Sequence, residues 1–212
     1  MWETATLFLN APLPPENVLA PLLPRMKKSF ILCADGGYLF AEKLPIQINA
    51  VIGDLDTVRD AKKVIAPPIQ VIEEPSQEFT DFEKALLYLK KQGTKEILLI
   101  GLTGERTDHV LANMSVLSRF INDFEFIVFG QEAKIYFLQG SQEIKIHTTP
   151  GKQISLMPLP LAENIVTKGL KYSLNSETLQ WGIREGSSNE AVQDWVSVKL
   201  GNGLLVIFEN YL

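Results

Sequence analysis

Residues 51–58 read "VIGDLDTV", and this stretch places two acidic side chains directly after a short apolar run. The apolar run is typical of a buried strand, which Gly53 ends. Because residues two apart in an extended segment point to the same side, Asp54 and Asp56 are expected to converge on one point. A hard cation would remove their repulsion, and Mg2+ prefers one or two carboxylates together with phosphates and water. A solvated surface turn is the alternative, since Asp is common in turns.

Strand-like and helix-like segments alternate from the N-terminus to about residue 130. Residues 80–93 give the clearest helix, with apolar side chains at helical spacing and Gly93 placed to end it. Such alternation predicts an α/β domain over residues 1–140, with a mostly parallel sheet and helices on both faces. The expected strands are residues 4–10, 30–34, 48–54, 69–74, 96–102 and 124–130, and the other expected helices are residues 16–28, 38–44 and 109–120.

The pattern changes after about Gly140, where short strand-like runs are separated by turn signals. These signals include Pro150-Gly151, residues 186–189 ("GSSN") and residues 201–203 ("GNG"). Residues 141–212 are therefore expected to form a smaller all-β sandwich domain. In the absence of a long linker, we expect the two domains to pack closely and to leave a cleft between them.

Composition restricts the possible partners and cofactors. The 212 residues carry a net charge of −5, so we expect no binding to nucleic acid or to an anionic membrane. The single cysteine, Cys33, excludes a disulfide framework, and two histidines disfavour a multi-histidine metal site. The sequence shows no signal peptide and no apolar stretch of membrane length, so the expected location is the cytoplasm.

Two glycines follow the expected strand at residues 30–34. Asp35 comes directly after this strand, and Gly36 and Gly37 allow close backbone approach before the N-terminus of a helix. The exposed N–H groups of such a turn suit a phosphate. A purely structural turn is the alternative interpretation.

The start of the helix at residues 80–93 combines a carboxylate with a cation. Thr80 and Glu83 fit a capping box, and Asp81 is favoured by the helix dipole, so a structural account is complete by itself. Lys84 lies about one turn from Asp81. A carboxylate and an ammonium together at a helix start can also serve a metal–phosphate site.

The loop after the strand at residues 96–102 combines glycines with an arginine, which suits a nucleotide phosphate chain. It matches neither the P-loop nor the G-x-G-x-x-G pattern, so dinucleotide binding is not indicated. Asp108 can be a plain helix cap, and a lone histidine is more often structural than catalytic. The candidate nucleotide contacts in this segment are Thr103, Gly104, Arg106, His109 and Asn113.

Acidic residues and glycines thus recur at successive strand ends of one predicted sheet. Because ligands of parallel α/β sheets bind beyond the carboxyl ends of the strands, these loops are expected to meet. Together they predict a site for a metal ion and a polyphosphate.

The motifs "CADGGYLFAEKL", "VIGDLDTV", "EFTDFEKALLYL" and "GLTGERTDHVLANM", in this order and spacing, resemble those of the thiamin pyrophosphokinase family. The C-terminal "GLKYSLNSETLQWGIREGSSNEAV" is similar to the thiamin-side segment of that family. The resemblance implies a homodimer whose subunits join an α/β domain to a β-sandwich. It also implies Mg2+-dependent transfer of a pyrophosphoryl group from ATP to the hydroxyl of thiamin, which gives thiamin diphosphate and AMP.

The resemblance assigns roles to the residues of these motifs. The acidic set around metal and phosphates corresponds to Asp35, Asp54, Asp56, Asp81 and Asp108, of which Asp54, Asp56 and Asp81 are the expected metal ligands. The phosphate contacts correspond to Lys84 and Arg106, with the turn of Gly36 and Gly37 beside ATP. The thiamin side, near the expected subunit interface, corresponds to Tyr172, Ser187, Ser188 and Asn189.

Two parts of the chain depart from the family pattern. The family usually has Asp-x-Asp-x-Thr-Asp, whereas this chain has Ser76 and Glu78 at the first two acidic positions. In the fourth motif, Glu105 takes the place of the second glycine of Gly-Gly-Arg. Both departures bear on metal affinity and rate more than on the class of substrate.

The expected chemistry is direct in-line transfer, in which the thiamin hydroxyl attacks the β-phosphorus of ATP. Asp81 and Asp56 are the candidates for accepting the hydroxyl proton. Tyr172 or Trp195 could stack on the cationic ring of thiamin. Both aromatics could equally belong to the core of the sandwich, which is the favoured interpretation for Trp195. One alternative is a Mg2+-dependent nucleotide phosphohydrolase, against which the thiamin-like segment argues. Another is a regulator that binds thiamin or a nucleotide without turnover, against which the intact acidic set argues.

Overall fold

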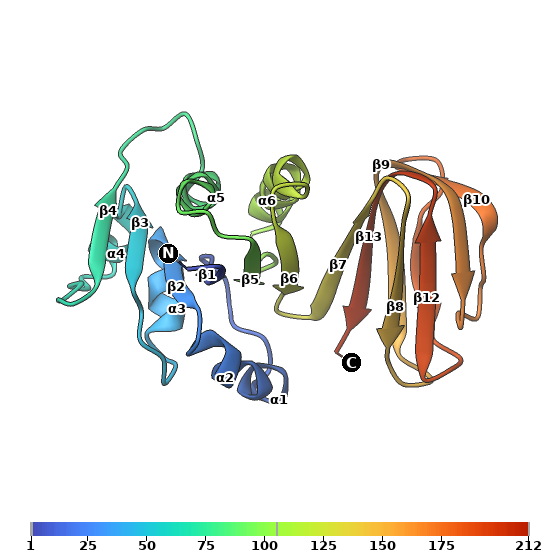
Figure 1. Cartoon of the computed structure of the whole chain (residues 1–212), viewed down its shortest axis with the longest axis horizontal. Helices are drawn as coiled ribbons and strands as arrows, with labels where there is room; N and C mark the ends of the chain where they lie inside the picture. Colours follow the sequence, from blue (N-terminus) through green and yellow to red (C-terminus); the bar gives the residue numbers. More distant parts are fainter. Residues whose placement is uncertain (1, 105, 212) are drawn as a thin grey trace. The chain divides into compact units, whose positions relative to one another are not determined.

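The computed structural model describes residues 2–104 and 106–211. The chain forms two compact units, Met1–Gln131 and Glu132–Leu212, which are described separately here (Figure 1). The second unit begins before the predicted boundary at residue 140, because strand β7 (Ala133–Gln139) pairs with the last strand, β13 (Asn202–Asn210). Across the described part of the chain, no helix is long and apolar enough to cross a membrane.

The first unit contains a parallel sheet in the order β4-β3-β2-β1-β5-β6. From β1 the chain adds strands outward on one side as far as β4, and β5 then pairs with the other edge of β1. The strand order therefore reverses between β1 and β5, where ligands of such sheets bind. The strands are β1 (Thr4–Phe8), β2 (Phe30–Ala34), β3 (Ala50–Gly53), β4 (Gln70–Glu73), β5 (Glu96–Ile100) and β6 (Glu125–Phe129).

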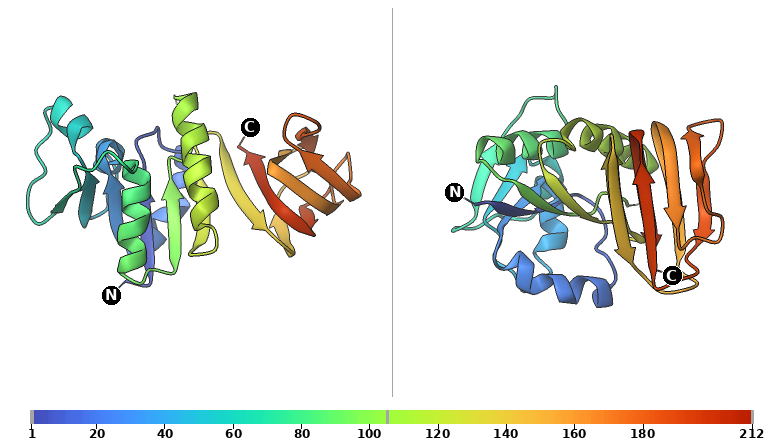
Figure 2. Two further views of the ribbon diagram at one scale, coloured as in Figure 1. Left: turned by 90° about the horizontal axis from the view of Figure 1, so that it is seen from above. Right: turned by 45° about the vertical axis from the view of Figure 1, so that its right-hand side comes forward.

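Helices cover both faces of this sheet, as predicted. The long helices α5 (Asp81–Lys91) and α6 (Thr107–Phe120) lie side by side on one face, and the short N-terminal helices lie on the other (Figures 1 and 2). Prolines break the helix predicted at residues 16–28 into α1 (Glu16–Leu19), a 3-10 turn (Ala20–Leu22) and α2 (Leu23–Met26). The remaining helices are α3 (Tyr38–Ala41) and α4 (Asp56–Asp60).

The core of the first unit follows from this double coverage. Strands β1, β2, β3 and β5 are buried along almost their whole length, whereas the edge strand β4 is largely exposed. Helix α5 packs against β2 and β3 and buries Leu86 and Leu89 completely. The central strands of the sheet that carries the strand-end loops are therefore packed on both faces.

The second unit is an antiparallel all-β domain built around one long strand, β9 (Gln153–Lys168). The sequence predicted short strands throughout this domain, but β9 is one long strand that runs through Pro158 and Pro160 and pairs with four other strands. Residues 186–189, predicted as a turn, lie within strand β11 (Gly186–Glu190). The other strands are β8 (Gln142–His147), β10 (Asn175–Gln180) and β12 (Trp195–Leu200). Among the described residues, every strand of this unit except β11 contributes to one apolar core.

Leu86→Ala is expected to lower the free energy of unfolding by about 2–4 kcal/mol, because the side chain is completely buried and its removal leaves a cavity. Leu87→Ala is the matched control, since Leu87 is adjacent on α5 and 40% exposed. It should change stability by less than about 1 kcal/mol. Chemical denaturation of both variants measures the difference, and equal losses would show that α5 does not pack on the sheet through Leu86.

Candidate active site

A cavity of about 570 Å³ opens at the carboxyl ends of the parallel strands in the first unit. Loops that follow β1, β2, β3 and β5 line it, together with the first turns of α5 and α6. This placement confirms the prediction that the strand-end loops meet, and it coincides with the reversal of strand order. The predicted site residues that line it are Asp35, Gly36, Asp54, Asp56, Asp81, Lys84, Gly104, Arg106, His109 and Asn113.

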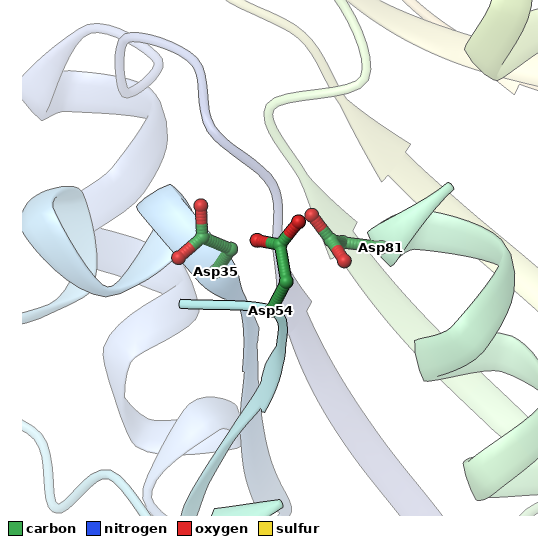
Figure 3. Close-up of side chains that lie close together, drawn as sticks. All are labelled: Asp35, Asp54 and Asp81. Atoms are coloured by element: carbon green, nitrogen blue, oxygen red, sulfur yellow. The ribbon is translucent and has the colours of Figure 1, made fainter. Parts of the chain in front are cut away.

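Three carboxylates converge in this cavity. Each of Asp35, Asp54 and Asp81 offers an oxygen atom, and these atoms all lie within 4.8 Å of one another (Figure 3). Asp35 follows β2, Asp54 follows β3 and Asp81 is the first residue of α5, so three separate elements supply the cluster. We call these residues the acidic trio.

Gly53 makes this convergence possible. Its φ of +145° is unfavourable for other residues, and a Cβ atom there would lie 2.9 Å from Asp81 Oδ1. The end of β3 therefore needs glycine so that Asp81 can approach the other two carboxylates. The sequence indicated only that Gly53 ends the strand.

Asp35 is the buried member of the trio, with 4% of its surface exposed. Its Oδ2 accepts a hydrogen bond from the Thr57 backbone N–H at 3.2 Å, while Oδ1 is buried without a hydrogen-bond partner among the described residues. Burial raises the pKa of the Asp35 carboxyl, and the charge of Asp81 adds to the increase. A φ of +35° also strains its backbone, which is typical of functional positions.

The surroundings of Asp54 are more polar than those of Asp35. Its Oδ2 accepts a hydrogen bond from Gln77 Nε2 at 3.1 Å, and its Oδ1 accepts one from the Asp56 backbone N–H at 3.2 Å. These bonds lower the pKa of the Asp54 carboxyl, so it is charged near neutral pH. The Arg59 guanidinium also donates to the Asp54 carbonyl oxygen at 2.8 Å, which fixes the backbone after β3.

Asp81 is paired with a buried cation. Lys84 Nζ donates to Asp81 Oδ1 at 2.9 Å, and the Lys84 side chain is only 3% exposed. A buried ammonium is stable only with charged or polar partners, so the acidic environment holds Lys84 in place. The predicted pairing of Asp81 with Lys84 at the start of α5 is thus present.

The acidic trio has the chemistry of a site for a hard cation. Three separate side chains present oxygen atoms, and the partnerless Oδ1 of Asp35 is a buried acceptor that the described chain leaves unsatisfied. Mg2+ prefers carboxylate oxygens and retains positions for phosphate and water. The residues present therefore fit such an ion.

Asp56 is not a member of the trio, although the sequence predicted it as a metal ligand. The prediction assumed an extended backbone between Asp54 and Asp56, and this assumption is wrong. Leu55 adopts the left-handed conformation (φ 62°, ψ 22°), and Asp56 begins helix α4. The exposed Asp56 side chain still lines the cavity, where its Oδ1 accepts a hydrogen bond from Thr57 Oγ1 at 3.1 Å.

The capping box predicted at the start of α5 is half formed. Thr80 Oγ1 accepts a hydrogen bond from the Glu83 backbone N–H at 3.2 Å. The Glu83 carboxylate instead binds Arg119 of α6 through two bonds of 2.7 Å. Glu83 therefore ties together the two helices whose first turns line the cavity.

The fourth motif contributes an exposed arginine to the cavity. Arg106 binds the Asp108 carboxylate at 2.5 and 3.2 Å, which lowers the pKa of Asp108. Asp108 itself does not line the cavity, so it acts here as a partner of Arg106. Thr103 Oγ1 accepts a bond from the Gln131 backbone N–H at 3.1 Å, and Asn113 Nδ2 donates to the Leu102 carbonyl at 3.3 Å.

The positions that depart from the family pattern lie beside the cavity. Ser76 Oγ accepts a bond from the Glu78 backbone N–H at 3.3 Å, and neither residue lines the cavity. Gln77, between them, does line it and bonds Asp54. Glu105 lies outside the described residues.

The residues predicted for thiamin lie in the second unit. Asn189 is buried, accepts a bond from the Tyr172 backbone N–H at 3.0 Å and donates one to the Tyr172 carbonyl at 2.7 Å. Its amide is thus used to hold the segment around Tyr172, whose side chain is 65% exposed. Ser187 and Ser188 are exposed on β11, and the Ser188 N–H donates to Ser155 Oγ at 3.1 Å.

Sequence reasoning missed several residues of the cavity. Asn10 follows β1, Gln77 and Phe79 lie in the segment before α5, and Thr57 bonds Asp35. The position of Asn10 after the first strand was a usable signal, because that strand also ends at the predicted site. Gln77 and Phe79 carried no such signal.

These features define a class of protein with an acidic cavity, whose carboxylates fit a cation, in an α/β unit that is followed by an all-β unit. A family model for the catalytic domain of thiamin pyrophosphokinase matches residues 25–129, and one for its vitamin B1 binding domain matches residues 141–205. The chain therefore belongs to the thiamin pyrophosphokinase family.

Curated relatives and solved structures agree with this assignment. Thiamine pyrophosphokinase 2 of Arabidopsis thaliana is 28% identical, with 95% of this chain and 84% of that protein covered. Thiamine pyrophosphokinase 1 of Oryza sativa subsp. japonica is 26% identical, with 95% and 85% covered. The fold is similar to that of thiamine pyrophosphokinase from Bacillus subtilis, with a TM-score of 0.81, 21% identity, and 99% and 100% of the chains covered.

Asp35→Asn is expected to raise the melting temperature of the metal-free protein at pH 7. The buried charge destabilises the fold, and the raised pKa of Asp35 means that the folded state binds the proton more tightly than the unfolded chain. This destabilisation is present in full above the raised pKa and vanishes below the ordinary Asp value of about 4. The advantage of the variant should therefore shrink as the pH falls toward 4.

Thermal denaturation in EDTA at several pH values measures this effect. Asp60→Asn is the matched control, since Asp60 is exposed on α4, and it should leave the melting temperature nearly unchanged. A lower melting temperature for Asp35→Asn than for wild type at pH 7 would contradict an unfavourable buried charge.

Proposed function

We propose that the chain transfers a pyrophosphoryl group from ATP to the hydroxyl of thiamin by direct in-line attack, giving thiamin diphosphate and AMP. The observation that carries this proposal is the acidic trio beside Lys84 and Arg106 in one cavity, in a member of this family. Such transfer depends on positioning and on charge stabilisation rather than on a covalent enzyme intermediate.

Asp35, Asp54 and Asp81 would hold Mg2+ in this scheme. When bound, the ion would neutralise charge on the phosphate oxygens during transfer. Two of these carboxylates are already oriented before an ion binds. Thr57 donates a hydrogen bond to Asp35, and Gln77 donates one to Asp54. A bound ion would give Asp35 Oδ1 the partner that it lacks within the described chain.

Lys84 and Arg106 would bind the phosphates of ATP. Lys84 is buried and held by Asp81, so its ammonium is fixed at the cavity wall. Arg106 is exposed and bound to Asp108, which orients the guanidinium at the cavity. A planar guanidinium suits two phosphate oxygens at once.

Asp56 is the better of the two candidates for accepting the hydroxyl proton. Asp81 is engaged by Lys84, and in this scheme also by the metal ion, so its oxygen atoms already have partners. Asp56 lies at the same cavity outside the trio and keeps an exposed carboxylate. A general base must reach the hydroxyl while remaining free to take its proton.

The thiamin side of the reaction is assigned to the second unit. A lysine ammonium lies over each candidate ring: Lys171 Nζ is 5.9 Å from the Tyr172 ring centroid, and Lys145 Nζ is 4.5 Å from that of Trp195. Tyr172 is the better candidate for the cationic heterocycle, because its side chain is exposed and its lysine is farther away, whereas Trp195 is partly buried. The family resemblance supports a homodimer with the thiamin site near the subunit interface.

Wild-type protein with ATP, Mg2+ and thiamin is expected to form AMP and thiamin diphosphate in equal amounts. AMP should be absent without thiamin, because thiamin supplies the attacking hydroxyl. Chromatography of nucleotides and thiamin esters measures both products. Release of ADP or phosphate without thiamin would indicate a phosphohydrolase, and ligand binding without turnover would indicate a regulator.

Asp54→Asn and Asp56→Asn are expected to fail in different ways. Asp54→Asn should raise the Mg2+ concentration for half-maximal rate by about 10- to 100-fold, since it removes a ligand of the trio. Asp56→Asn should keep the Mg2+ requirement within about threefold while lowering kcat by about 100-fold or more. Steady-state kinetics over a range of Mg2+ concentrations separate the two variants. If both variants raised the Mg2+ requirement equally, Asp56 would be a metal ligand after all.

A further inference from the structure

The segment that follows β1, residues 9–12, occupies the reversal of strand order. The Leu9 N–H donates to the Ile100 carbonyl at 2.9 Å, which extends the pairing of β1 with β5. The Ala11 N–H then donates to the Leu9 carbonyl at 2.8 Å, so the chain makes a tight turn centred on Asn10. We call residues 9–12 the β1 loop.

The β1 loop explains three glycines that the sequence assigned to phosphate binding. A Cβ atom on Gly36 would lie 2.4 Å from Asn10 Cγ, one on Gly37 would lie 2.3 Å from the Phe8 carbonyl oxygen, and one on Gly104 would lie 2.7 Å from Ala11 Cβ. Contacts below 3.0 Å require the neighbour to move. The glycine turns after β2 and β5 therefore make room for the end of β1 and the loop that follows it.

The amide of Asn10 lies against the backbone at Gly36. The Cβ position of Gly36 lies 2.4 Å from Asn10 Cγ and 2.6 Å from both Nδ2 and Oδ1. Nδ2 and Oδ1 are equally far from this position, and both are farther than Cγ. The flat face of the amide group is therefore turned toward Gly36, and its N–H and C=O groups point elsewhere. Asn10 is exposed and lines the cavity, and no hydrogen bond connects its amide to the described chain.

Asparagines with structural roles in this protein look different. The amide of Asn49 accepts a bond from the Ile31 N–H at 2.7 Å, and that of Asn113 donates to the Leu102 carbonyl at 3.3 Å. An amide that lies against the backbone at the cavity and leaves its donors unused can give them to a ligand. This contrast points to a binding role for Asn10.

We infer that Asn10 binds the phosphate chain of the nucleotide by donating a hydrogen bond from Nδ2 to a phosphate oxygen. The inference rests on the proposed function, because that function makes a nucleoside triphosphate the ligand of this cavity. Gly36, on which the amide lies, directly follows Asp35 of the acidic trio. Carboxylates cannot donate to a phosphate, so a neutral donor beside them adds a contact that the trio lacks.

Asn10→Ala is expected to weaken the binding of a nonhydrolysable ATP analogue with Mg2+ by about 10- to 100-fold, as for loss of a hydrogen bond to a charged group. Asn10→Asp should weaken it further, because it replaces the donor with a negative charge of the same shape. Asn122→Asp makes the same chemical change in an exposed turn of the same unit and should bind like wild type. Titration calorimetry measures all three affinities.

Gly36→Ala supplies a test that separates binding from folding. Alone, it should lower the melting temperature and the affinity, because the new Cβ displaces the Asn10 amide. Combined with Asn10→Ala, it should regain the melting temperature, since the clashing atoms are gone, but not the affinity. Recovery of affinity in the double variant would overturn the inference.

Affinity of Asn10→Ala within about twofold of wild type would also overturn the inference. The binding readout does not depend on turnover of thiamin. Loss of analogue binding in Asn10→Ala would support the role of Asn10 even if the wild type formed no thiamin diphosphate, in which case only the proposed function would fail.

Discussion

Repulsion among three carboxylates is the constraint on which the cavity depends. Asp35, Asp54 and Asp81 hold oxygen atoms within 4.8 Å of one another, and one of these side chains is buried. Like charges at such distances disfavour ionisation unless a cation or hydrogen bonds compensate. The chain supplies Lys84 and a few donors, and it leaves one buried oxygen without a partner among the described residues. The folded chain thus retains an unfavourable arrangement that a divalent ion and phosphates would relieve.

The sheet topology sets where this arrangement forms. Strand order reverses between β1 and β5, so the loops that leave these two strands diverge and open a cavity. The β1 loop fills part of this opening and packs against the glycine turns after β2 and β5. Glycine at these positions therefore has a packing reason, and the contact to phosphate is assigned to the side chain of Asn10.

The sequence predicted the α/β unit well, because buried parallel strands and amphipathic helices leave strong patterns. The six strands and the helices α5 and α6 appear close to their expected positions. The long strand β9 was not predicted, because the sequence indicated only short strands in the second unit, whereas β9 runs unbroken from Gln153 to Lys168. The strand β7 was not recognised, and the domain boundary shifted with it.

The sequence predicted most of the residues of the site correctly but not how their side chains are arranged. The acidic residues and glycines were placed at the correct strand ends, but Leu55 turns the backbone into the left-handed region and separates Asp56 from Asp54. A single residue with positive φ leaves little trace in a sequence when it is not glycine. Asp35 takes the place in the trio that was predicted for Asp56. Gln77 and Asn10 also contribute polar groups to the cavity that no motif indicated.

The most direct test of this account is the position of a divalent ion in crystals of the protein grown with Mn2+ in place of Mg2+. Anomalous scattering would locate the ion independently of its chemistry. The account predicts a peak within coordination distance of oxygen atoms of Asp35, Asp54 and Asp81, with Asp35 Oδ1 among the ligands. A peak bound by Asp54 and Asp56, with Asp35 outside the coordination sphere, would contradict it.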